Sequence, residues 1–332
     1  MNEIYNEYNN RTVLVTGGAG SIGGNLSRRL IELGAKKIII LDDLSSAYQW
    51  NVPLAKNVIF IHGSILDDEI LRRAFKEKPN IIFHLAAHFA NQNSVDNPEK
   101  DLIINGMGIL KVLEHAQMVN VDRFVYSSSG CGVYGLESKI PFEEHDVSIH
   151  LHTPYQITKL LGELYTNYFH SMYDVPIVNA RFFNVFGPGE VPGKYRNVIP
   201  NFMYWSMKGL PLPITGNGSE TRDWTYVGDI IDGLLTMGIK KEAIGEAFNL
   251  GSGKEHTVLE MATLINKLTG NSKGIKFTER RDWDVKTRLC SSIGKAQKAL
   301  GYQPRMDFEV GLKNVHQWFM DNWKDIEKSA EF

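Results

Sequence analysis

The 332-residue sequence is poor in cysteine and in long apolar runs, and each absence excludes a class of protein. Its two cysteines, Cys131 and Cys290, cannot build a disulfide framework, and neither belongs to a CxxC pair. We therefore expect free thiols in a reducing cytoplasm, and no metal site. No apolar segment approaches the roughly 20 residues that span a bilayer, and the first residues lack the pattern of a signal peptide. We expect a cytoplasmic protein without membrane contact.

The chain also lacks an excess of charge of either sign. Its 36 Lys and Arg residues and 38 Asp and Glu residues give a formal net charge of −2. Domains that bind nucleic acid usually carry a basic excess or stripe, so we expect no nucleic-acid partner. The composition, 43% hydrophobic and 22% charged, is typical of globular proteins. At roughly 150 residues per domain, the length suggests about two structural units.

The first half of the chain alternates short apolar segments with amphipathic segments of helix length. A predicted strand at 12–16 is followed by a glycine cluster and by a helix at 21–33, whose apolar residues recur at helical spacing. Gly34 is a candidate C-terminal cap of that helix. Further strands are predicted at 37–41, 58–62, 81–85, 123–127 and 177–182. This order predicts an α/β fold with a doubly wound parallel sheet and right-handed crossovers.

The alternation weakens after about residue 184. Residues 185–225 are rich in Gly, Pro and Asn, which suits loops around a ligand. A helix at 229–238 and a strand at 246–250 are predicted to return to the sheet, and 256–332 predict helices with little strand signal. We expect a first domain at 1–184, to which 226–255 return. A smaller, interrupted C-terminal substrate domain is expected from 185–225 and 256–332.

A glycine-rich loop, Gly17-Gly18-Ala19-Gly20-Ser21-Ile22-Gly23, joins the first predicted strand to the first helix. Glycines permit the tight turn and let a pyrophosphate approach the helix N-terminus. Asp42 lies 19 residues after Gly23, where a carboxylate can accept both ribose hydroxyls and would repel a 2′-phosphate. The pattern predicts a Rossmann-type dinucleotide site that prefers NAD to NADP. Asp43 is a competing acceptor, and a plain structural turn is the alternative.

Tyr155 and Lys159 form the second candidate site. Their four-residue step places both side chains on one face of a helix that Thr153 can cap and Pro154 can begin. A phenol has a pKa near ~10, which makes it a poor base at neutral pH. A fixed ammonium and a positive nicotinamide ring would lower that pKa and permit proton abstraction from a sugar hydroxyl. The serines at 127–129 end a predicted strand, where a hydroxyl can bond the same substrate oxygen or act as a local cap.

The glycine loop and the Tyr/Lys pair belong to a longer series of motifs. In chain order these are Thr16–Gly23, His84-Leu85-Ala86-Ala87, Ser127-Ser128-Ser129, Val133-Tyr134-Gly135, Tyr155 with Lys159, Arg181-Phe182-Phe183-Asn184, Asn197-Val198-Ile199-Pro200, Thr221-Arg222-Asp223-Trp224, Arg281-Asp282-Trp283-Asp284 and Leu300-Gly301-Tyr302. Over nearly its whole length, the sequence thereby resembles the extended short-chain dehydrogenase/reductase family, and within it the NAD-dependent nucleotide-sugar 4-epimerases.

The resemblance implies a role for each candidate residue. Tyr155 would be the catalytic base, Lys159 would hold the ribose and tune the phenol, and Ser129 would be the hydroxyl partner, with Ser128 as the alternative. The implied NAD contacts are Gly17, Gly20, Ser21, Ile22, Gly23, Asp42, Ser64, Ile65, Leu85, Ala86, Ala87, Ser127, Tyr155, Lys159 and Phe182. The implied substrate contacts are Ser129, Asn184, Asn197, Val198, Thr215, Arg222, Arg281 and Asp284. Arginine suits a diphosphate because its planar fork pairs two oxygens.

Four positions depart from the family pattern. Ser64 replaces an aspartate that often reads the adenine amine, and Thr215 replaces an aromatic residue that stacks on the base. Gly130 and Cys131 stand where the dehydratase branch has an acidic pair, and water elimination needs an acid and a base at neighbouring carbons. Cys131 is either a buried structural thiol or, as in the 3,5-epimerase and epimerase-reductase branch, a proton-exchange group.

The resemblance therefore implies an NAD-dependent 4-epimerase of a UDP-hexose, either UDP-glucose/galactose or their N-acetyl forms. The reaction would pass through a transient 4-keto sugar with tightly retained NAD. The alternatives are a UDP-uronate 4-epimerase, another nucleotide-sugar epimerase, a net dehydrogenase or reductase that consumes free NAD(P)H, and a non-catalytic dinucleotide sensor. The helix that bears the Tyr/Lys motif commonly forms a homodimer interface in this family. Apolar Leu161 and Phe169 are local candidates for it, and buried core is their alternative role.

Overall fold

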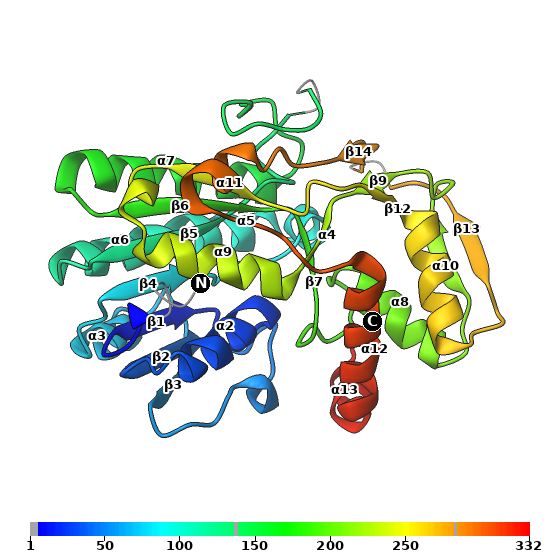
Figure 1. The fold of residues 1–332 in the computed structure, drawn as a ribbon, viewed down its shortest axis with the longest axis horizontal. Coiled ribbons are helices and arrows are strands. Elements are labelled where there is room, and N and C mark those ends of the chain that lie inside the picture. Colours follow the sequence, from blue (N-terminus) through cyan, green and yellow to red (C-terminus); the bar gives the residue numbers. More distant parts are fainter. Residues whose placement is uncertain (1–5, 136–138, 282–283) are drawn as a thin grey trace.

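The computed structural model describes residues 6–135, 139–281 and 284–332 (Figure 1). The first five residues and the middle of the Arg281–Asp284 motif, on which predictions were made above, lie outside the described residues. A seven-stranded sheet, the largest in the described residues, forms the centre of the fold. Its strands are β1 (Thr12–Thr16), β2 (Lys37–Asp42), β3 (Val58–His62), β4 (Ile81–His84), β5 (Arg123–Ser129), β6 (Ile177–Phe182) and β11 (Ala247–Leu250).

The strand order confirms the predicted doubly wound parallel sheet. The order is β11-β6-β5-β4-β1-β2-β3, and every pairing within it is parallel. The direction of winding reverses between β1 and β4, which are neighbours in the sheet but far apart in the chain. In open α/β sheets, ligands bind at the carboxyl ends of the strands beside such a reversal. The topology therefore places the expected site beyond Thr16 and His84.

Helices cover both faces of this sheet, and alternate strand residues point to opposite faces. Val13 and Val15 pack into the core with α2 (Ser21–Glu32), α9 (Val227–Ile239) and α11 (Gly294–Leu300). Leu14 packs into the opposite core with α3 (Asp68–Lys76), α6 (Gly108–Met118) and α7 (Pro154–Tyr173). With both faces covered, the central strands β1, β2 and β4 consist mainly of apolar residues, as in parallel sheets generally. Helix α11 differs from the expected domain division, because it lies in the range assigned to the substrate domain yet packs beside this sheet.

The loops expected at 185–225 occupy only part of that range, and the helices expected at 256–332 are accompanied by short strands. These ranges contain β7 (Asn184–Phe186), α8 (Val198–Met207), β8 (Leu212–Thr215), β9 (Thr221–Arg222), β10 (Trp224–Tyr226), β12 (His256–Thr257), α10 (Val258–Thr269), β13 (Ile275–Thr278), β14 (Arg288–Leu289), α12 (Phe308–Asp321) and α13 (Trp323–Ser329). The strands are too short for an alternating pattern to be recognised in the sequence. They are stabilised by pairing with one another, β8 with β13 and β9 with both β12 and β14.

Several shorter elements complete the described chain. They are η1 (Gln49–Asn51), α4 (Asn91–Asp96), α5 (Pro98–Asp101), η2 (Leu102–Met107) and η3 (Lys241–Ala243). In Figure 1, α8, α10 and β13 lie together at one end of the molecule, away from the large sheet. Across the described ranges, we find no helix with both the length and the apolar character needed to cross a bilayer.

Helix α7 carries the Tyr/Lys pair and lies close against β5. The side chain of Thr153 accepts a hydrogen bond from the Gln156 amide (3.4 Å), and Pro154 is the first residue, which confirms the predicted start of the helix. Gly162 permits the close approach, since a Cβ there would lie 2.0 Å from the Tyr126 hydroxyl of β5. The helix face that bears Tyr155 and Lys159 is thus held directly on the strand that ends in the serine cluster.

Candidate active site

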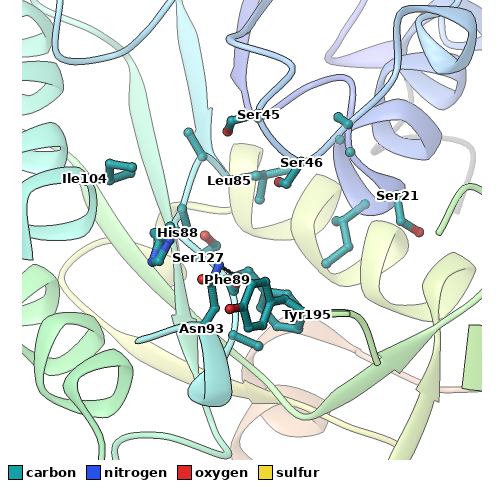
Figure 2. Close-up of a pocket in the computed structure, with 18 of the residues that line it drawn as sticks. Ser21, Ser45, Ser46, Leu85, His88, Phe89, Asn93, Ile104, Ser127 and Tyr195 are labelled. Carbon is teal, nitrogen blue, oxygen red and sulfur yellow. Dashed lines mark hydrogen bonds between the residues drawn. The ribbon is translucent and has the colours of Figure 1, made fainter. Parts of the chain in front are cut away.

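A cavity of about 680 Å³ lies along the carboxyl ends of the central strands (Figure 2). Figure 2 shows Ser21, Ser45 and Ser46 on one side of this cavity, and His88, Phe89, Asn93 and Tyr195 grouped on another. All residues predicted to contact NAD line the cavity, together with three of the predicted substrate contacts. In chain order these are Gly17, Gly20, Ser21, Ile22, Gly23, Asp42, Ser64, Ile65, Leu85, Ala86, Ala87, Ser127, Ser129, Tyr155, Lys159, Phe182, Asn184 and Asn197.

The glycine loop has the space that a dinucleotide diphosphate requires. Gly17 has a φ of +69°, and a Cβ there would lie 2.6 Å from the Ala86 nitrogen, so only glycine fits. At Gly20 the nearest atom to an added Cβ would be 3.4 Å away, so this position is open. Helix α2 begins at Ser21 without a side-chain cap and without an acidic residue in its first turn. Its first N–H groups are therefore available to an anion, and the residues present fit NAD.

Asp42 both supports the glycine loop and lines the cavity. Its carboxylate accepts hydrogen bonds from the amides of Ala19 and Leu44, each at 2.9 Å. Burial raises the pKa of Asp42. Each carboxylate oxygen retains acceptor capacity for a ribose hydroxyl. Asp43 also lines the cavity and accepts from the Ser45 amide (2.9 Å), so both acidic residues stay candidates.

The catalytic candidates lie together at the end of β5. The Lys159 ammonium donates to the Ser127 carbonyl at 2.8 Å and lies 5.6 Å from the centre of the Tyr155 ring. The Ser129 hydroxyl lies near enough to the Tyr155 phenol to lower the pKa of that phenol. Ser128 is buried, and its hydroxyl donates to the carboxylate of Glu163 on α7. Of the two serines considered from the sequence, Ser129 is therefore the one in contact with Tyr155.

Burial dominates the titration of this pair. It lowers the pKa of Lys159 to about 8, and the nearby carboxylate of Asp101 opposes that shift. It raises the pKa of Tyr155, the charge of Asp101 raises it further, and the hydrogen bond from Ser129 opposes the increase. The sequence led us to expect a lowered phenol pKa. The residues of the chain act in the opposite direction because desolvation outweighs their favourable contacts.

A cluster of buried polar side chains close to Tyr155 and Lys159 was not identified from the sequence. Asp101 is fully buried, and it accepts hydrogen bonds from Thr158 (2.7 Å) and Asn105 (2.9 Å). The Nδ1 atom of His88 lies 3.6 Å from the same carboxylate. Asp101 follows β4 through short helices with no recognisable motif. The only available signal was that chain leaving β4 at the winding reversal tends to line a ligand site.

Two further predicted substrate contacts, Asn184 and Asn197, line the cavity. Asn184 accepts a hydrogen bond from the Cys131 thiol (3.4 Å), and Asn197 donates from its amide and side chain to Glu190 (3.2 and 3.3 Å). Burial raises the pKa of Cys131 to about 12, so the thiol stays neutral near pH 7. A neutral thiol is a poor proton-exchange group, which favours the structural role for Cys131.

Five predicted substrate contacts do not line this cavity, namely Val198, Thr215, Arg222, Arg281 and Asp284. Arg222 and Asp284 are nevertheless brought together as an ion pair (3.2 Å). The cavity is also lined by residues that the sequence reasoning missed, including Ser45, Ser46, Tyr48, Asn51, His88, Phe89, Asn91, Asn93, Lys100, Glu190, Tyr195 and Arg196. Many of them follow the carboxyl ends of β2 and β4.

In the part of the chain that the structure covers, no three His, Cys, Asp or Glu residues are grouped to hold a metal.

Comparison with known proteins gives a consistent family. Residues 13–251 match the NAD dependent epimerase/dehydratase family. A UDP-glucose 4-epimerase of Mycolicibacterium smegmatis is 33% identical, over 92% of this chain and 97% of its own. The structure of an epimerase from Methanothermobacter thermautotrophicus is 68% identical, with a TM-score of 0.98 over 99% of this chain and 98% of its own. A UDP-glucose 4-epimerase of Thermotoga maritima, solved with UDP-glucose, is 33% identical with a TM-score of 0.89, covering 94% and 99%. The chain therefore belongs to the NAD dependent epimerase/dehydratase family, which confirms the predicted family and its NAD cofactor.

Proposed function

We propose that the chain is an NAD-dependent 4-epimerase of a UDP-hexose, either UDP-glucose/galactose or their N-acetyl forms. The grouping of Ser129, Tyr155 and Lys159 in the wall of the dinucleotide cavity, with Lys159 held on the Ser127 carbonyl and 5.6 Å from the Tyr155 ring, is the observation that carries this proposal. The names of two similar proteins, both UDP-glucose 4-epimerases, support the substrate class. The proposed substrate contacts are Ser129 and the residues assigned above from the family resemblance.

Bound NAD supplies the acceptor and donor of the hydride at C4 of the sugar. The chain's part is to move and hold one proton. Tyr155 removes the proton from the C4 hydroxyl as the 4-keto sugar forms. It returns the proton after the sugar has rotated and is reduced on its other face. Ser129 donates a hydrogen bond to the same oxygen in both directions. Lys159, fixed by the Ser127 carbonyl, supplies the positive charge that an ionised phenol needs.

Two related reactions are disfavoured by the residues after Ser129. Dehydration needs an acid at this place, but position 130 is glycine, and a Cβ there would lie 2.2 Å from the Phe183 ring. Position 131 holds a thiol whose pKa is raised to about 12, which does not suit 3,5-epimerisation. The intact set of Ser129, Tyr155 and Lys159 also favours an enzyme over a non-catalytic sensor.

The experiment is incubation of the purified protein with a panel of UDP-sugars, without added cofactor, followed by NMR. We expect interconversion of the 4-epimers of one UDP-hexose, no net change in NADH absorbance, and NAD released on denaturation. The Tyr155→Phe variant should lose turnover while keeping NAD. Tyr173→Phe, an exposed tyrosine of the same helix, is the matched control. Conversion of a UDP-uronate instead would replace the hexose assignment, and net consumption of NADH would replace the epimerase assignment.

We also propose a homodimer formed through α7, although not through both residues first suggested. Phe169 is 4% exposed and belongs to the core, so the buried-core alternative is correct for it. The exposed apolar residues of α7 are Ile157 (54%), Leu164 (59%) and Met172 (63%), which recur at helical spacing. Leu164→Glu should convert a dimer into a monomer in light scattering, while Leu210→Glu, an exposed leucine elsewhere, should not. A monomeric wild-type protein would contradict the proposed homodimer.

The cytoplasmic location stays a prediction.

A further inference from the structure

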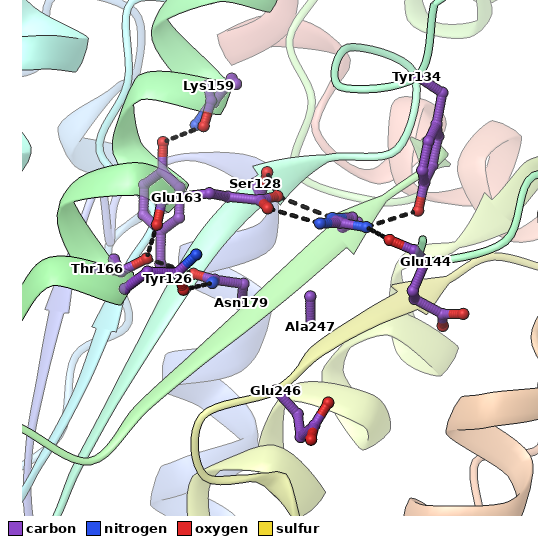
Figure 3. Close-up of polar contacts among 12 residues, drawn as sticks. Tyr126, Ser128, Tyr134, Glu144, Lys159, Glu163, Thr166, Asn179, Glu246 and Ala247 are labelled. Atoms are coloured by element: carbon purple, nitrogen blue, oxygen red, sulfur yellow. Dashed lines mark hydrogen bonds and ion pairs between the residues drawn. The ribbon is translucent and has the colours of Figure 1, made fainter. Parts of the chain in front are cut away.

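A buried ion pair lies on the same face of α7 as the catalytic candidates (Figure 3). Arg181 of β6 donates to Glu163 through two parallel hydrogen bonds, from Nε to Oε1 (2.9 Å) and from Nη2 to Oε2 (2.7 Å). The side chains of Arg181 and Glu163 are 5% and 4% exposed. Ser128 of β5 donates its hydroxyl to the same carboxylate. These three residues, called the clamp below, join one helix to two strands.

The clamp continues the series of contacts that holds the catalytic groups. Tyr155, Lys159 and Glu163 are spaced by four residues, so they lie on one face of α7. Each of them contacts one of three consecutive residues of β5. Tyr155 meets the Ser129 hydroxyl, Lys159 meets the Ser127 carbonyl, and Glu163 meets the Ser128 hydroxyl. A shift of α7 along or away from β5 would therefore disturb all of these contacts together.

Arg181 extends this fixation to the chain that follows Ser129. Its Nη1 atom donates to the Tyr134 hydroxyl (3.0 Å) and to the Glu144 carbonyl (2.6 Å). The Tyr134 hydroxyl in turn donates to Asn249 of β11 (2.6 Å). One guanidinium thus holds both the helix that bears Tyr155 and the segment that continues from its serine partner.

We propose that Glu163, Arg181 and Ser128 are positioning residues, which fix α7 on β5 so that Tyr155 meets Ser129 and the reacting sugar carbon. This inference rests on the proposed function. Stability alone is a weak reason for the clamp, because apolar side chains of similar volume often stabilise a core as well as a buried ion pair does. The paired hydrogen bonds of an arginine and a carboxylate are directional, which apolar contacts are not. Reactions that depend on placement lose rate steeply with small displacements.

Two variants separate positioning from stability. Ser128→Ala removes one hydrogen bond from the clamp, and the double variant Glu163→Met with Arg181→Met replaces both charges by apolar side chains. In each case we expect kcat to fall by about tenfold or more, on the scale of a misplaced reacting group. KM for the UDP-sugar should change little. The double variant should keep a Tm near that of the wild type. Thr166→Val is the matched control, because it removes a buried hydroxyl of α7 that bonds the Glu163 backbone carbonyl and Asn179 but none of the clamp side chains.

Crystal structures of the wild type and the double variant give a readout that does not depend on the substrate. We expect the Tyr155–Ser129 hydrogen bond in the wild type and its loss, with a displaced α7, in the double variant. An unchanged hydrogen bond, or a wild-type kcat in either variant, would overturn the positioning role. A wild type that converts no UDP-sugar would refute the proposed function instead, and the crystal structures would still decide the placement of Tyr155.

Discussion

Replacing Asp101 by asparagine removes a buried negative charge beside the catalytic candidates while keeping the size of the side chain. That charge raises the pKa of Tyr155 and also the pKa of Lys159. Its removal should therefore lower both pKa values. Activity needs the phenol to release its proton and the amine to keep its own. Both limbs of the pH profile of kcat/KM should consequently move to lower pH.

The expected magnitude follows from the surroundings of Asp101. A charge within about 4–6 Å of a titratable group shifts the pKa of that group by roughly 1–3 units. Thr158 and Asn105 donate hydrogen bonds to Asp101 and so weaken the effect of its charge on Tyr155 and Lys159. We therefore expect a pKa shift at the lower end of this range, about 1 unit or about 1.4 kcal/mol. Lys159, whose pKa is about 8, would then lose its proton near pH 7. At about pH 9 the variant should be about tenfold less active than the wild type, and at about pH 6 at least as active.

The other titratable groups around Asp101 do not reverse this sign. Burial lowers the pKa of His88, and burial raises the pKa of Tyr126 well above its usual value. Lys100, next to Asp101 in the chain, is a further charge that acts on His88. The assay is the kcat/KM profile of both proteins. Asp122→Asn, an exposed carboxylate, makes the same change of net charge far from the cavity and should leave the profile in place. An alkaline limb of the kcat/KM profile of Asp101→Asn that lies at the same pH as in the wild type, or at a higher pH, would refute the reasoning.

Three further substitutions test separate features of the site. Gly162→Ala places a Cβ 2.0 Å from the Tyr126 hydroxyl, so the free energy of unfolding in denaturant should fall by about 1–3 kcal/mol, whereas Gly294→Ala, with open space at its Cβ, should cost little. Asp42→Ala removes the acceptor of two loop amides at 2.9 Å, so the NAD retained after gel filtration should drop by roughly tenfold or more; full retention would contradict the assignment. Cys131→Ser keeps a donor for Asn184, and kcat should stay within about threefold of the wild type. A large loss of kcat would restore a chemical role for the thiol.

The large sheet could be predicted from the sequence because its strands are buried on both faces. Segments such as Lys37–Asp42 and Ile81–His84 have an apolar pattern that depends little on tertiary context. The small paired strands after Asn184 could not be predicted, since two to four residues give no period and their stability comes from distant partners. Thr221–Arg222, for example, forms a strand only between His256–Thr257 and Arg288–Leu289.

The site was predictable where chemistry requires a residue type at a fixed spacing, as at Gly17–Gly23 or Tyr155 with Lys159. It was not predictable where a side chain acts through a contact that only the fold creates. Asp101 is an ordinary acidic residue in the sequence, yet in the structure it is fully buried behind Tyr155 and Lys159. The choice between Ser128 and Ser129 likewise depends on which residue of α7 each hydroxyl approaches, Glu163 for Ser128 and Tyr155 for Ser129.

The electrostatics of the pair explain why the phenol and the cofactor have to be considered together. Burial and Asp101 both favour a neutral Tyr155, and the hydrogen bond from Ser129 opposes them only in part. The chain alone therefore keeps the base protonated and inactive. A positive charge at the nicotinamide position would lower the pKa of the phenol, and loss of that charge on reduction would raise it again. The proton affinity of Tyr155 would then be highest while the keto sugar is present and lowest when a hydroxyl proton has to be taken. Because burial keeps Tyr155 neutral unless a positive charge is nearby, the charge of the nicotinamide would control whether Tyr155 takes or gives a proton. This suits an epimerisation, in which the sugar is first oxidised and then reduced.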